Sequence, residues 1–114
     1  MMVLQRHKQA LMAYLKAYAA KNLGAIEMMF AEDISLCDWN LAVQGKAAAL
    51  AETQKNFDAV RELQIEVLAV HESAEAVAAE LLIRVDRQHE LRVVDVLGFD
   101  DQGLIRSIRA YKGL

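Results

Sequence analysis

The 114-residue chain is long enough to bury one hydrophobic core, and its length predicts a single domain over residues 1–114. Apolar residues make up 55% of the chain and charged residues 25%, a balance that excludes a disordered protein. The formal net charge is -3 and the basic residues are scattered, which argues against binding to nucleic acid.

Cysteine, histidine and hydropathy patterns exclude further classes of protein. The lone Cys37 cannot form an intramolecular disulfide, and no cysteine–histidine spacing resembles a zinc site, so we expect no metal and no cofactor. His7, His71 and His89 are far apart in the chain and are expected on the solvated surface. No apolar run reaches the length of a membrane span, and the N-terminus lacks the apolar core of a signal peptide. We therefore expect a cytoplasmic protein that does not bind membranes.

The first half of the chain carries helical patterns. From Val3 to Ala20, apolar side chains recur at steps of three and four residues and predict a helix with one apolar face. Asn22 can cap a second helix over residues 23–30. A short strand is predicted over residues 34–38, and the strong helix formers of residues 45–57 predict a third helix.

The second half changes to a strand period. Segments rich in valine and isoleucine predict four strands, over residues 63–70, 74–86, 89–99 and 104–112. The connections between these segments are short and polar, as in hairpins, and Gly103 can take the positive φ of a tight turn. Helices followed by an antiparallel meander predict an α+β fold, with the helices packed on one side of a curved sheet.

Two aspartates interrupt the apolar rows of predicted strands. Because side chains alternate between faces, Asp38 ends the apolar row of strand 34–38, and Asp95 lies in the middle of the more apolar row of strand 89–99. An ionised carboxylate in such a place must be paired, hydrogen-bonded or protonated. Tyr14 brings a hydroxyl from the apolar face of the first helix toward the same interior. Three polar groups in one apolar concavity predict a ligand site.

Each of these signals also has a structural interpretation. Asp38 could stand at the solvated end of its strand, in a turn. Asp95 could point outward if its face of the sheet is the solvated one, and Tyr14 could be a core tyrosine. Val94 and Val96 make the opposite face apolar too, so one face of the sheet could contact a partner subunit.

Three blocks of the sequence carry a resemblance to a known superfamily. They are "YLKAYAAKNLGAIEMMFAEDISLCDW", "GKAAAL" and "VVDVLGFDDQGLIRSIRAYKG". These blocks resemble the nuclear-transport-factor-2-like (NTF2-like) superfamily and, within it, the branch of the ketosteroid isomerases and SnoaL-like polyketide cyclases. The resemblance implies a cone-shaped fold, in which helices close the mouth of a strongly curved, mostly antiparallel sheet. It also implies a homodimer that packs through the sheet.

The resemblance assigns a role to each of the three polar residues. Asp38 falls where the isomerases keep their general base, Tyr14 where they keep an oxyanion-hole hydroxyl, and Asp95 where they keep a carboxylic acid that its apolar site holds neutral. In such a site a base removes a proton beside a carbonyl group, while two donors stabilise the enolate oxygen. The implied function is cofactor-free enolisation, isomerisation or cyclisation of a small apolar carbonyl compound.

Residues expected to bind the substrate are Trp39, Phe30, Leu97, Ile108 and Thr53. Two of them depart from the isomerase pattern. Trp39 follows Asp38 where the isomerases usually have proline, and Thr53 replaces a pocket tyrosine on the third helix. These departures weaken the case for a steroid substrate more than the case for proton transfer.

Two other functions stay open. The first is a ligand-binding or association module without catalysis, because one fold hosts many functions. The second is an epoxide-hydrolase-like enzyme, which needs an arginine two residues from an aspartate on an inward face. Arg84 and Asp86 have that spacing, but they share a face with Glu80, opposite the apolar row. Arg92 has the wrong parity relative to Asp95.

Overall fold

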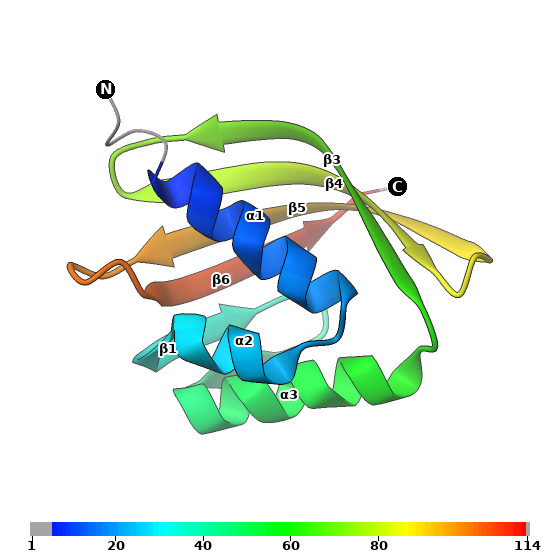
Figure 1. The fold of residues 1–114 in the computed structure, drawn as a ribbon, viewed down its shortest axis with the longest axis horizontal. Helices are drawn as coiled ribbons and strands as arrows, with labels where there is room; N and C mark the ends of the chain where they lie inside the picture. Colours follow the sequence, from blue (N-terminus) through cyan, green and yellow to red (C-terminus); the bar gives the residue numbers. More distant parts are fainter. Residues whose placement is uncertain (1–5, 114) are drawn as a thin grey trace.

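A computed structural model of the protein describes residues 6–113, in which three helices cover one side of a six-stranded sheet (Figure 1). The helices are α1 (Arg6–Ala19), α2 (Leu23–Met29) and α3 (Lys46–Ala59). The strands are β1 (Phe30–Cys37), β2 (Ala42–Gln44), β3 (Leu63–Glu72), β4 (Ala76–Val85), β5 (His89–Phe99) and β6 (Ile105–Lys112). The predicted α+β class is confirmed. Residues 3–5 of the predicted first helix lie outside the described range.

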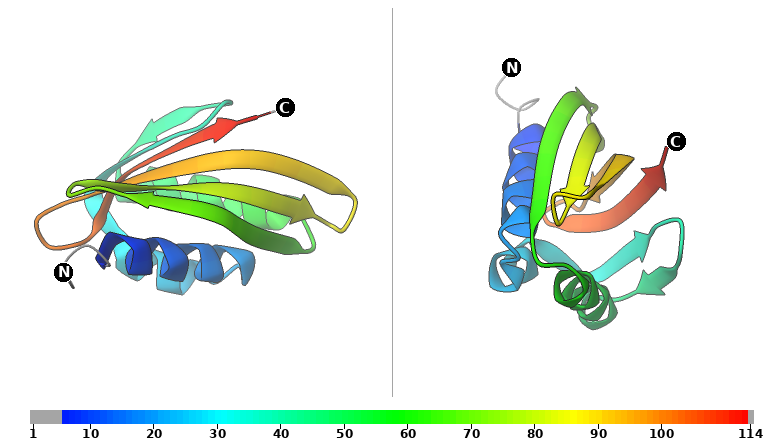
Figure 2. Two further views of the ribbon diagram at one scale, coloured as in Figure 1. Left: turned by 90° about the horizontal axis from the view of Figure 1, so that it is seen from above. Right: turned by 90° about the vertical axis from the view of Figure 1, so that its right-hand side faces the viewer.

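The sheet has the strand order β2-β1-β6-β5-β4-β3. The four strands β3 to β6 form the predicted antiparallel meander, and β1 pairs in parallel with β6 and antiparallel with β2. Register shifts between β3 and β4 and between β5 and β6 mark bulges, with the extra residue in β3 and in β6, and bulges bend strands. Figure 2 shows the result, a curled but unclosed sheet with the helices on its concave side.

Two features of the sheet were not predicted from the sequence. Strand β1 begins at Phe30, the residue after α2, whereas the hydrophobic pattern predicted a strand only from residue 34. Strand β2 is only three residues long, which is too short for an alternating pattern to be recognised. The turn at Gly103 does match its prediction, since this residue has a φ of +84° and donates its N–H to the Asp100 carbonyl.

The prediction of a surface position is wrong for one histidine, His7. His7, in the first turn of α1, is only 9% exposed, and its ring stacks on Phe99 with the ring centroids 4.4 Å apart. Its backbone N–H donates to the Glu72 carboxylate at 2.9 Å, which satisfies a free amide at the start of the helix. These contacts tie the start of α1 to the end of the sheet. His71 and His89 are exposed, as predicted.

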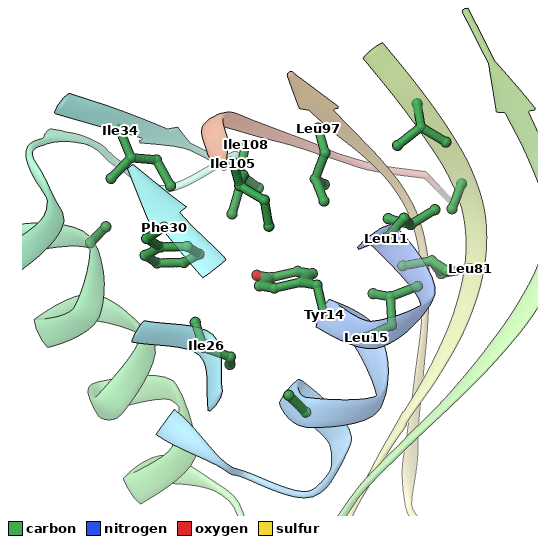
Figure 3. Close-up of a cluster of buried hydrophobic side chains, with 14 of the residues drawn as sticks. Leu11, Tyr14, Leu15, Ile26, Phe30, Ile34, Leu81, Leu97, Ile105 and Ile108 are labelled. Carbon is green, nitrogen blue, oxygen red and sulfur yellow. The ribbon is translucent and has the colours of Figure 1, made fainter. Parts of the chain in front are cut away.

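A hydrophobic core lies between the helices and the sheet (Figure 3). Its largest fully buried side chains are Leu11, Ile26, Phe30, Ile34, Val77, Leu81, Leu97 and Ile105. The cavity described below borders this core and shares Tyr14, Leu15, Leu81 and Ile108 with it. No helix within residues 6–113 is long and apolar enough to cross a membrane.

The β4–β5 turn holds the connection from α3 to β3 at the edge of this cavity. Asp86 and Arg87, at φ 54° and 60°, take the left-handed conformation that such a tight turn needs. The Asp86 carboxylate accepts the backbone N–H groups of Arg61 and Glu62 at 2.7 and 2.9 Å, and these two bonds lower the pKa of Asp86. Nearby, the Lys21 ammonium donates to the Val60 carbonyl.

We predict that Asp86→Ala lowers the melting temperature, while Asp86→Asn lowers it much less. Asparagine keeps an acceptor oxygen and tolerates positive φ, whereas alanine provides neither. Because the folded-state pKa of Asp86 is lowered, its ionic contribution is present above the ordinary carboxyl pKa and is lost as the pH falls toward the lowered value. Thermal unfolding at neutral and acidic pH measures both effects. Equal melting temperatures for the two variants at neutral pH would contradict this role.

Candidate active site

A cavity of about 260 Å³ lies between α1, α3 and the inner face of the sheet. Most of the side chains that line it are apolar: Leu15, Leu36, Ala59, Val60, Leu63, Ile65, Leu81, Ile83, Val85, Leu91, Val93, Ile108 and Ala110. Among the described residues, no lysine, arginine or histidine lines it. A cavity with this lining favours an apolar ligand without negative charge.

Asp95 brings a carboxyl group into this apolar lining from the middle of β5. Its cross-strand neighbours are Ala79 on β4 and Ala110 on β6, whose methyl groups can neither pair with the carboxyl nor cover it. Burial raises the pKa of Asp95 to about 6, because an ionised carboxylate is poorly solvated there. Asp95 therefore titrates close to neutral pH.

Tyr14 reaches the same cavity from the buried face of α1. Its ring lies between those of Tyr18 and Phe30, with centroid separations of 5.8 and 6.2 Å, and Figure 3 shows it projecting from α1 into the interior. Burial, followed by the charge of Asp95, raises the pKa of Tyr14 well above its usual value. The hydroxyl therefore stays protonated and can act as a hydrogen-bond donor.

Neither of these two polar groups has a hydrogen-bond partner in the described part of the chain. No hydrogen bond among residues 6–113 involves the Tyr14 hydroxyl or the Asp95 carboxyl, yet neither belongs to the buried polar atoms that lack a partner. Both groups must therefore open onto the cavity. Polar groups inside folded proteins are nearly always hydrogen-bonded. Because these two groups face the cavity, a ligand bound there can supply the hydrogen bonds that they lack among the described residues.

Asp38 lines the cavity from the end of β1 and also holds a turn. One carboxylate oxygen accepts the backbone N–H groups of Asn40 and Leu41, at 2.8 and 3.0 Å. Both earlier interpretations of Asp38, as a turn residue and as a residue of the site, therefore describe part of its environment. Its second oxygen accepts no hydrogen bond from the described residues.

The five predicted substrate-binding residues divide into two groups. Trp39, Thr53 and Ile108 line the cavity, whereas Phe30 and Leu97 do not and lie in the core beside it. The indole of Trp39 is 45% exposed. The Thr53 hydroxyl donates to the Ala49 carbonyl of its own helix at 2.8 Å, so it is already used within α3.

Three polar residues of the cavity were missed by the sequence analysis: Tyr18, Asn40 and Asn56. Tyr18 could have been found, because it follows Tyr14 by four residues and so lies on the same face of α1. Asn56 carries no comparable signal in the sequence, since it is one of several polar residues along α3.

The arginine–aspartate arrangement of an epoxide-hydrolase-like site does not form in this cavity. Arg84 lies outside the cavity, where it pairs with Glu66 and Glu90, and Asp86 belongs to the β4–β5 turn. Arg92 is exposed on the outer face of β5. Within the described part of the chain, no cluster of histidine, cysteine, aspartate or glutamate could hold a metal ion.

The model of the SnoaL-like domain family matches residues 11–108, which include the whole lining of the cavity except Ala110. The chain belongs to the SnoaL-like domain family. No curated protein has a matching sequence.

Solved structures with the same fold carry several different functional names. A candidate ketosteroid isomerase from Kribbella flavida has a TM-score of 0.85 at 15% identity, over 97% of this chain and 80% of that one. An epoxide hydrolase/cyclase-like enzyme of pyran ring formation in the polyether salinomycin has a TM-score of 0.83 at 22% identity, over 96% and 92%. An NTF2-like protein of unknown function from Cytophaga hutchinsonii has a TM-score of 0.79 at 13% identity, over 94% and 89%. Identities this low show the NTF2-like fold and leave the activity to be argued from the cavity.

We predict that Asp95→Asn stabilises the protein at neutral pH. The folded-state pKa of about 6 lies above the ordinary value of 3.8, so folding favours the protonated form. Stability then falls as the pH rises from about 4 to about 6 and levels off above that. Thermal unfolding should show the variant melting on the order of 5 °C higher at pH 7. The difference should vanish near pH 4.

Asp101→Asn is the matched control, because Asp101 is an exposed turn residue and the substitution removes the same negative charge as Asp95→Asn. Its melting temperature should follow that of the wild type at every pH. An Asp95→Asn variant that is less stable than the wild type at pH 7 would contradict a poorly solvated carboxyl at this position.

Proposed function

We propose that the protein catalyses cofactor-free proton transfer on a small, neutral, apolar carbonyl compound. The Asp38 carboxylate accepts a proton from the carbon beside the carbonyl, and the C–H electron pair forms the C=C bond of an enolate. Tyr14 and protonated Asp95 donate hydrogen bonds to the enolate oxygen. In a β,γ-unsaturated compound the enolate is a dienolate, and Asp38 returns the proton to the γ-carbon, so that the C=O bond re-forms and the C=C bond moves into conjugation with it.

The observation that carries this proposal is that the Asp95 carboxyl and the Tyr14 hydroxyl line one cavity, while neither has a hydrogen-bond partner among residues 6–113. Two hydrogen-bond donors in an apolar cavity stabilise an oxygen that gains negative charge, and this stabilisation is larger in a dry site than in water. The pKa of Asp95, raised to about 6 by burial, keeps a substantial protonated fraction near pH 6. A bound apolar ligand removes further water and shifts this pKa in the same direction.

The lining also limits the ligand. Without a lysine, arginine or histidine among the described lining residues, the cavity offers no counter-charge to a carboxylate or a phosphate. Its volume of about 260 Å³ is below the usual range of about 300 to 1,000 Å³ for ligand pockets. A compound with one or two rings therefore fits the proposal better than a steroid.

We predict that Asp38→Asn slows proton exchange at the carbon beside a carbonyl by about 100-fold or more. The probe is 2-tetralone, a small bicyclic ketone, and the measurement is uptake of deuterium from D₂O, followed by NMR with and without protein. Asp33→Asn is the control, because Asp33 is an exposed carboxylate of the same strand that pairs with Arg106. Its exchange rate should equal that of the wild type. Exchange that persists unchanged in Asp38→Asn would show that the base has been assigned wrongly.

A second candidate function is ligand binding without catalysis. The observation in its favour is the turn at Asp38, because two backbone N–H groups already occupy one oxygen of the proposed base. The side chain of Asp38 is thus already committed to holding the turn. The exchange experiment separates the two functions, since a binding module would hold 2-tetralone without accelerating exchange.

We also propose that the protein is a homodimer that packs through the outer face of the sheet. The middle of this face is apolar at Val94 and Val96 of β5, and both side chains are half-buried in the single chain. A two-fold interface requires a patch that is complementary to itself. An apolar centre with polar surroundings is the usual composition of such an interface.

Val96→Lys should convert the dimer to a monomer, because it places an ammonium group in the middle of the apolar contact. Light scattering after size-exclusion chromatography measures the mass. Met28→Lys is the control, since Met28 is 79% exposed on α2 and lies away from the sheet. A wild-type protein that is monomeric at micromolar concentration would refute the proposed interface.

A further inference from the structure

Tyr18 and Asn56 form a hydrogen-bonded pair that joins two helices beside the cavity. The Asn56 side-chain amide on α3 donates to the Tyr18 hydroxyl oxygen on α1 at 3.1 Å, and both residues line the cavity. Neither residue has a role in the proton transfer proposed above. The pair nevertheless adds a third hydroxyl to a cavity that is otherwise mostly apolar.

Aromatic contacts fix the position of this hydroxyl. The Tyr18 ring meets Phe57 edge-on, with centroids 4.9 Å apart and an interplanar angle of 74°. Its centroid also lies 5.8 Å from that of the Tyr14 ring. These two contacts restrict the position of the ring, and the hydrogen bond from Asn56 restricts its hydroxyl group.

The hydrogen bond from Asn56 uses only the acceptor capacity of the hydroxyl. A phenol also carries one O–H donor, and no acceptor for it exists among the hydrogen bonds of the described residues. Burial raises the pKa of Tyr18, the hydrogen bond from Asn56 lowers it by a smaller amount, and the charges of Asp95 and Asp38 raise it further. Neither carboxylate accepts the Tyr18 proton in a hydrogen bond among the described residues. The proton therefore stays on the oxygen and is available to a ligand.

We propose that the Tyr18 hydroxyl, oriented by Asn56, is a second ligand-binding donor, and that the ligand is an apolar carbonyl compound with a second oxygen function. The second oxygen is an acceptor, such as an ether, a hydroxyl or a second carbonyl. This inference rests on the proposed function, since it takes Tyr14 and Asp95 to bind the first oxygen. Asn56 acts through Tyr18 and is a positioning residue.

The spacing of the two tyrosines limits where the second oxygen lies on the ligand. Tyr14 and Tyr18 are four residues apart on α1, and the centroids of their rings lie 5.8 Å apart. A ligand that binds both therefore needs two oxygens separated by a distance of this order. Oxygen functions at positions 1 and 4 of one six-membered ring meet this requirement.

The test compares two phenols of nearly equal size, 4-methoxyphenol and 4-ethylphenol, which differ by an ether oxygen in place of a CH₂ group. The phenol oxygen of each stands in for the enol oxygen at Tyr14 and Asp95. The measured quantity is the ratio of the two dissociation constants, determined by calorimetry at pH 6. In the wild type the methoxy compound should bind more tightly than the ethyl compound. In Tyr18→Phe this preference should fall by about 3- to 10-fold, the loss expected for one neutral hydrogen bond.

Two more variants keep the test decisive. Asn56→Ala should reduce the preference in the same direction but less, because the hydroxyl remains and only its orientation is lost. A merely structural hydrogen bond would change stability without changing this ratio. Tyr111→Phe removes the hydroxyl of an exposed tyrosine outside the cavity and should leave the ratio at the wild-type value.

The possible results separate this inference from the proposed function. If both phenols bind the wild type and the ratio is the same in Tyr18→Phe and Asn56→Ala, the second donor does not exist and the proposed function stands. If neither phenol binds the wild type, the oxygen site at Tyr14 and Asp95 fails, and the inference fails with it.

Discussion

The rest of this site depends on one carboxyl group that lies in an apolar lining and has no hydrogen-bond partner among residues 6–113. Leu97 lies two residues after Asp95 on the same face of β5 and is completely buried in the core. The difference between the two positions lies in their surroundings, because Asp95 has alanines on both sides and stands where packing gives way to the cavity. Burying this group costs stability. Proteins commonly accept such a cost where a polar group serves a ligand.

Much of this arrangement could be predicted from the sequence, because the signals were local. Strand alternation placed Asp95 and Asp38 on inward-facing rows, and helical spacing placed Tyr14 on the buried face of α1. The parallel pairing of β1 with β6 could not be predicted in this way, since it joins segments more than 70 residues apart. Phe30 and Leu97 show a related limit. Their hydrophobicity predicts burial, but not whether the buried place is core or cavity wall.

Other misses have the same physical origin. Burial of His7 depends on Phe99 and Glu72, which are brought to it only by the folded sheet. The hydrogen bond between Tyr18 and Asn56 joins two helices, and no periodic pattern in the sequence indicates it. Asp38 was predicted in part. The residues around it indicated a turn, but whether its side chain also lines the cavity depends on the curl of the folded sheet.

The position of β6 in the sheet has a consequence for the order in which the molecule is assembled during synthesis. This strand lies between β1 and β5, and its Ile108 and Ala110 complete one wall of the cavity. The ribosome synthesises residues 105–112 long after α1, α2 and β1, so β1 cannot pair with β6 until then. Contacts between such distant segments slow folding. We therefore expect the binding hollow to be absent from the nascent chain until its final strand is in place.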